Sequence, residues 1–194
     1  MNQIGALAAI LGPALLFAFY WSEATFGPSQ PNGGALRMAA GFQLICGGMI
    51  CIVIALLCLR AQAPSPGSRL VRGGTLLGYA AVVLLAVGSA LWWPILLVWP
   101  DLGPIAGAPV GLGGLSFFGA WSLLGLSALR QHALPSWARA LPLALFALFL
   151  LILYVSGTAS SWPLVAATFA PFALGWAFLA YVMWSAPSNK TLAA

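Results

Sequence analysis

Long uninterrupted runs of apolar residues alternate with a few charged residues along this chain. The stretch 38–59 contains no charge and is bounded by Arg37 and Arg60. As a helix it would be about 33 Å long, at roughly 1.5 Å per residue. This length matches the hydrocarbon core of a bilayer, which is roughly 30 Å thick. The pattern therefore predicts a membrane-spanning helix with one arginine at each end.

The same pattern divides the whole chain into six predicted spans. The uncharged stretch 140–189 is too long for one helix, and Gly157, Ser161 and Pro163 provide a stop and a new start within it. We expect an all-α fold, a polytopic transmembrane helical bundle that forms a single domain over residues 1–194. The predicted spans are about 4–21, 38–59, 74–93, 115–129, 141–156 and 163–184.

The segment 101–114 interrupts this pattern because it is rich in Gly and Pro, including Pro104 and Pro109. Irregular backbone that faces lipid would leave its polar groups without partners. We therefore expect an irregular connection that lies at the membrane surface or is tucked between helices.

Composition places the chain among integral membrane proteins. Hydrophobic residues make up 62% of it and charged residues only 5%, whereas soluble domains carry about 25% charged residues. The formal net charge is +5, from seven basic and two acidic residues. In a soluble protein such a charge could indicate nucleic-acid binding. Here the basic residues are scattered at predicted helix ends, so we expect membrane lipids and no nucleic acid as partners.

The charges also predict an orientation. With six spans both termini lie on one side of the membrane, and only Arg37 among the basic residues falls on the other, together with Glu23 and Asp101. Lys and Arg are enriched in short cytoplasmic loops. We therefore expect cytoplasmic N- and C-termini and, from the richness in Ala, Leu and Gly, a bacterial inner membrane. The basic residues on the side of the termini are Arg60, Arg69, Arg72, Arg130, Arg139 and Lys190.

Candidate chemistry is sparse. No ionisable Asp, Glu, Lys, Arg or His falls inside a predicted span, so a proton relay across the membrane has no obvious carrier. His132 is the only histidine, and the three cysteines are well separated, so no metal site is predicted. We expect no enzymatic activity. Arg130, His132 and Arg139 remain candidates for contact with a lipid headgroup or an acidic partner surface.

Four polar or aromatic span residues are candidates for ligand or lipid contact: Gln43, Tyr79, Trp121 and Tyr154. The Gln43 amide needs a partner in a dry environment, and either an interhelical hydrogen bond or the carbonyl of a quinone, pigment or lipid would supply one. Trp121 follows Phe117 and Phe118, and this cluster suits helix packing or a pigment. No cofactor is predicted; pigment, quinone and lipid are the alternatives left open.

Small residues at a spacing of four indicate close helix packing. Gly74 and Gly78 form Gly-x-x-x-Gly in the third span, and Ala173 and Ala177 have the same spacing in the sixth. Such faces allow helices to approach closely, within the bundle or against another subunit.

The connection between the fourth and fifth spans follows a recognisable order. A helix ends at Arg130, Leu134-Pro135-Ser136-Trp137 follows, and Arg139 precedes another apolar helix. In this feature the second half of the chain resembles a diffuse class of small, uncharacterised six-helix bacterial membrane proteins. The resemblance implies a six-helix fold and brings no activity with it.

Three functional hypotheses are compatible with these features. The leading one is a non-enzymatic subunit with a structural, assembly or accessory role in a larger membrane complex, and a bioenergetic or photosynthetic complex would suit the aromatic content. The second is a small transporter for a neutral or apolar substrate, with a mid-membrane cavity lined by Gln43, Tyr79 or Tyr154 beside kinks at Pro13 and Pro171. The third is an enzyme acting on lipid or quinone.

Overall fold

The computed structural model is an all-α bundle, and it describes residues 2–26, 34–61, 68–98, 103–130, 134–158 and 162–185. Its six long helices are all long and apolar enough to cross a membrane, which confirms the predicted fold class. A single turn of 3₁₀ helix, η2 (Ser136–Ala138), precedes the fifth. The long helices are α1 (Asn2–Phe26), α2 (Gly34–Ala61), α3 (Arg69–Val98), α4 (Gly103–Arg130), α5 (Leu141–Thr158) and α6 (Trp162–Ser185).

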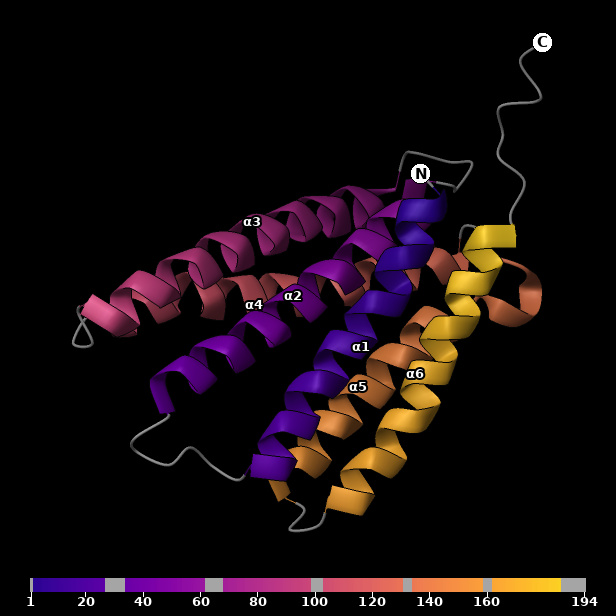
Figure 1. Cartoon of the computed structure of the whole chain (residues 1–194). Helices are drawn as coiled ribbons and strands as arrows, with labels where there is room; N and C mark the ends of the chain where they lie inside the picture. The colour runs from indigo at the N-terminus through magenta and orange to yellow at the C-terminus, as the bar shows by residue number, and fades with distance from the viewer. Residues whose placement is uncertain are drawn as a thin grey trace.

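The helices form a closed ring in chain order. Each packs against the next, α1 also packs against α6, and α2 additionally contacts α4. The most extensive contact joins α3 to α4, which lie side by side and lean away from α1, α5 and α6 (Figure 1). The start of α1 and the end of α6 lie at the same end of the bundle (Figure 1), as an even number of spans requires.

The predicted irregular conformation of the Gly/Pro-rich segment is wrong for residues 103–114, because α4 begins at Gly103 and these residues are helical. The physical reason is that backbone polar groups in an apolar environment need hydrogen-bond partners, and a helix supplies them within the segment itself. Pro104 stands in the first turn, where its missing N–H costs nothing. Gly113 then lies against Leu85 of α3, where an added Cβ would come within 2.9 Å of Leu85 Cγ.

The helices also extend beyond the predicted spans. α1 ends at Phe26 rather than near residue 21, and α3 continues through Pro94 to Val98. α1 and α6 run through Pro13 and Pro171 without a break in the helix. The sequence pattern marks the apolar part of each helix, whereas the helices themselves extend beyond that part.

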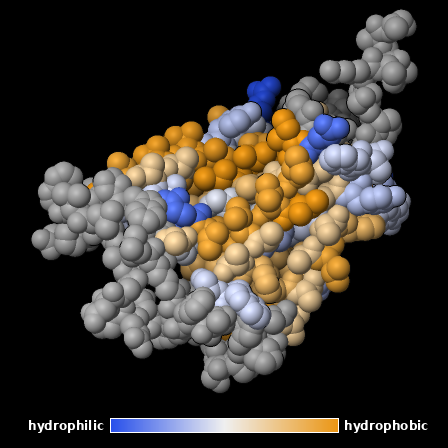
Figure 2. Space-filling model, viewed as in Figure 1, coloured by the Kyte–Doolittle hydropathy of each residue, from blue (hydrophilic) through white to orange (hydrophobic). Residues whose placement is uncertain are grey.

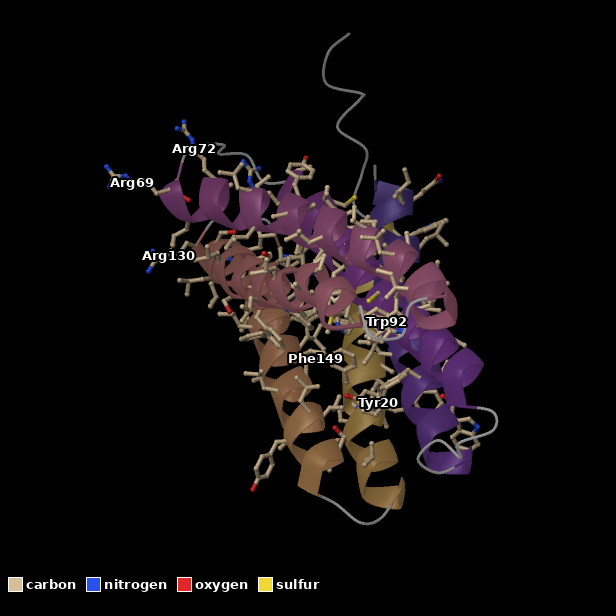
Figure 3. The ribbon with its side chains drawn as sticks, turned by 90° about the vertical axis from the view of Figure 1, so that its left-hand side faces the viewer. Tyr20, Arg69, Arg72, Trp92, Arg130 and Phe149 are labelled. Atoms are coloured by element: carbon tan, nitrogen blue, oxygen red, sulfur yellow. The ribbon has the colours of Figure 1, made fainter. Side chains whose placement is uncertain are left out.

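The core is an aromatic cluster between α4, α5 and α6. Trp121 and Trp176 are fully buried, with ring centroids 5.5 Å apart, and Phe149 also lies 5.5 Å from Trp121. Figure 3 places Phe149 in the middle of the bundle. Tyr20 extends the cluster to α1 through Phe169, at a centroid distance of 5.2 Å. The centre of this half of the molecule is therefore filled by rings.

The outer surface is correspondingly apolar. Figure 2 shows a broad hydrophobic surface over the middle of the helices that face the viewer. An apolar surface of this extent is unfavourable in water and suits contact with lipid or with other membrane helices.

Candidate functional site

Gln43 connects α2 to α3. Its Nε2 donates a hydrogen bond to the backbone carbonyl oxygen of Ser89, at 2.7 Å. Next to it, Phe42 stacks on Trp92 with a centroid distance of 4.5 Å and an interplanar angle of 17°. The amide therefore has its partner within the bundle. Of the two roles considered for Gln43, an interhelical hydrogen bond and a ligand contact, the structure shows the first.

We expect Gln43→Leu to weaken the α2–α3 contact by about 0.6–1.7 kcal/mol, the range for interhelical hydrogen bonds in membrane proteins. The matched control is Ser122→Ala, because within the described segments the Ser122 hydroxyl bonds to the Phe118 carbonyl of its own helix, so little change is expected. Reversible unfolding of both variants in mixed micelles measures the difference. Equal loss in the two variants would contradict a specific contribution from Gln43.

Tyr79 lies on the outside of α3 and is 61% exposed. It borders a surface groove between α2 and α3, whose other polar walls are Arg60 and Thr75. The groove has a volume of about 420 Å³, within the roughly 300–1,000 Å³ typical of small-molecule sites.

Trp121 and Tyr154 have opposite environments. Trp121 is fully buried, and its indole Nε1 donates to the carbonyl oxygen of Pro142 at 2.9 Å. It therefore does not reach the lipid-facing surface, and its neighbours are other core rings. Tyr154 is 68% exposed on α5. Of the three polar residues considered for a cavity, Tyr79 lines the α2–α3 groove, whereas Gln43 bonds to the Ser89 carbonyl.

The small residues of the third span face two neighbours. A Cβ on Gly74 would lie 3.0 Å from Leu124 of α4, and one on Gly78 would lie 3.1 Å from Leu57 of α2. The absence of side chains at both positions lets α3 sit closely between α2 and α4.

The alanines of the sixth span are placed differently. Ala173 and Ala177 are exposed and border an apolar groove of about 300 Å³ against α1, beside Pro13 and Phe17. A close contact between α6 and α5 is made instead at Gly175, where a Cβ would lie 2.5 Å from Leu145 Cδ2.

The basic connection before α5 is compact. Arg139 Nε donates to the Leu134 carbonyl at 3.4 Å, and the Trp137 ring lies 5.0 Å from that of Phe178 on α6. Arg130 is exposed at the end of α4. The expectation for His132 lies outside the described residues, as does that for Asp101.

Sequence reasoning missed the roles of Arg60 and Trp176. Arg60 was treated as the end marker of a span, but its Nε is buried with no hydrogen-bond acceptor in the part of the chain that the structure describes. The same holds for the indole Nε1 of Trp176 in the core. The sequence carries no signal for this role of Arg60, because it depends on the packing of α2 against α3, which brings Arg60, Thr75 and Tyr79 to one groove.

No protein-family model matches the chain, and no curated protein or solved structure matches it either.

Proposed function

We propose that this chain is a non-enzymatic integral membrane subunit with a structural or assembly role in a larger membrane complex. The observation that supports it is how polar groups within the spans are used. The Ser127 and Thr168 hydroxyls bond to carbonyls of their own helices, at 2.7 and 2.8 Å, and Gln43 bonds to α3. Each of these groups has its hydrogen-bond partner inside the bundle, two within one helix and Gln43 across to α3. We therefore look to the outer surface for the contacts of such a subunit.

The surface of α3 offers a continuous apolar face for such a contact. Its exposed side chains follow one another at intervals of three or four residues, so they share one side of the helix. These side chains are Leu76, Tyr79, Val83, Val87 and Leu91. A face of this kind packs against lipid or against the helices of a partner subunit.

Photo-crosslinking in native membranes tests the proposal. The crosslinking residue is placed on exposed positions of three helices, Val83, Leu115 and Leu174, and at buried Phe149 as the control. We expect at least one exposed position to give an adduct with a polypeptide that also co-purifies at fixed stoichiometry in mild detergent, and Phe149 to give none. Adducts with lipid alone, together with a protein that migrates as a lone monomer, would refute the proposal.

We further propose a bacterial inner-membrane location with the basic end of the bundle in the cytoplasm. Support comes from Arg60, Arg69 and Arg130, which lie at the helix ends on the side of the chain termini. A fluorescent protein fused after residue 194 is expected to fluoresce, and alkaline phosphatase fused there to be inactive. The reverse pair of results would overturn the orientation.

A further inference from the structure

The groove between α2 and α3 lies toward the basic end of the bundle and has both polar and apolar walls. Along α2 its residues recur every three or four positions, so they share one side of the helix. Ile54 lies about 9 Å deeper than Arg60, at roughly 1.5 Å per residue. The groove therefore extends from the helix ends into the apolar zone. It is lined by Ile54, Leu57, Cys58, Arg60, Ala61, Thr75 and Tyr79.

Arg60 is the unusual wall of this groove. It stands in the last turn of α2, and its Nε is shielded from solvent without an acceptor among the described segments. A charged donor that is withdrawn from water and left unpaired is costly. The guanidinium is planar and matches the oxygens of a phosphate group in paired hydrogen bonds. Only Nε is enclosed by the protein, so an anion in the groove would pair with the outer nitrogens of the same guanidinium.

The surroundings of the groove favour a negative ligand. Arg69 and Arg72 project outward from the start of α3, and Arg130 does so from the end of α4, at the same end of the molecule (Figure 3). Glu23 belongs to the last turns of α1, at the opposite end of the bundle. Basic pockets between membrane helices at a cytoplasmic boundary are typical sites for acidic lipids.

We propose that the α2–α3 groove binds a phospholipid with an anionic headgroup. The phosphate pairs with the Arg60 guanidinium beside the Thr75 hydroxyl, and one acyl chain lies along Ile54, Leu57 and the ring of Tyr79. The apolar walls select a lipid over a free phosphate ion, since a small anion would leave them uncovered. A zwitterionic lipid carries the same phosphate together with an ammonium group, which the positive charge of Arg60 repels, so an acidic lipid is favoured.

Lipid titration of the purified full chain in dodecyl maltoside tests this site. Phosphatidylglycerol and phosphatidylcholine are added separately, and bound lipid is measured by native mass spectrometry alongside the midpoint of thermal unfolding. We expect phosphatidylglycerol to bind about tenfold more tightly. Arg60→Gln should abolish this preference. Arg130→Gln should retain it, because Arg130 is an exposed cation at the same end that does not line the groove.

Three outcomes would overturn the proposal. One is no preference for phosphatidylglycerol in the unaltered chain. Another is an equal loss in Arg130→Gln and Arg60→Gln, which would indicate general surface charge. The third is an equal shift of the unfolding midpoint with inorganic phosphate at the same concentration, which would indicate a free anion.

Two further variants keep the test decisive if Arg60→Gln does not fold. Thr75→Val removes a hydroxyl with little change of shape, and Tyr79→Ala alters a side chain that is largely exposed. Each is expected to weaken phosphatidylglycerol binding several-fold, in the manner of a lost hydrogen bond or apolar contact. Unchanged binding in both variants would refute the proposed site.

Discussion

Trp121→Ala is expected to destabilise the bundle by about 3–5 kcal/mol, the usual cost of truncating a buried Trp or Phe. Trp121 is fully buried where α4, α5 and α6 meet, and its ring contacts those of Phe117, Phe149 and Trp176. Removing the indole opens a cavity that rings from three helices surround. The measurement is the free energy of unfolding in mixed micelles of dodecyl maltoside and dodecyl sulfate.

Trp176 provides a matched control for the hydrogen bond of Trp121. Both indoles are fully buried, but Trp121 Nε1 donates to the Pro142 carbonyl at 2.9 Å, whereas Trp176 Nε1 has no acceptor within the described ranges. Trp→Phe removes a similar volume at each site. We expect Trp121→Phe to cost more than Trp176→Phe by about 0.5–1.5 kcal/mol, the net value of one hydrogen bond. Equal costs would show that the bond to α5 contributes nothing.

The number of helices could be predicted because charge is so rare in this chain. Each apolar run ends near Arg, Lys or a cluster of Gly and Pro, and helices are the only open-ended structures that satisfy their backbone in lipid. The segment 101–114 was misassigned because propensities measured in water count Gly and Pro as helix breakers. In an apolar environment the unpaired backbone is the larger penalty, and α3 offers a close neighbour at Gly113.

The candidate sites could be predicted only in part, because they depend on which helix lies beside which. The sequence indicated that Gln43 needs a partner, but the carbonyl of Ser89 lies 46 residues away and carries no signal in its side chain. The groove at Tyr79 depends on the contact of Gly78 with Leu57. The sequence pattern predicts Arg60 at the membrane boundary. It does not predict the groove that Arg60 lines, because the groove forms only when α2 packs against α3.

Gly48→Ala is expected to lower the free energy of unfolding by about 1–3 kcal/mol, the range for overpacking of a close contact. α1 and α2 cross at Gly12 and Gly48, and a Cβ on Gly48 would lie 2.8 Å from Leu16 Cγ and 3.0 Å from the backbone oxygen of Gly12. The Leu16 side chain could shift, but the backbone oxygen of Gly12 cannot move away from the new methyl group without moving α1. The two helices would have to separate.

Gly111→Ala is the matched control for this contact. Nothing lies within 4 Å of a Cβ added there, and the residue is exposed on α4. Alanine is the better helix former by about 1 kcal/mol, so this variant should be as stable as the unaltered chain or more stable. If Gly48→Ala lowers the free energy of unfolding and Gly111→Ala does not, the loss comes from the close approach of α1 and α2 and not from alanine itself. Loss of stability in Gly111→Ala, or none in Gly48→Ala, would contradict the crossing at Gly12 and Gly48.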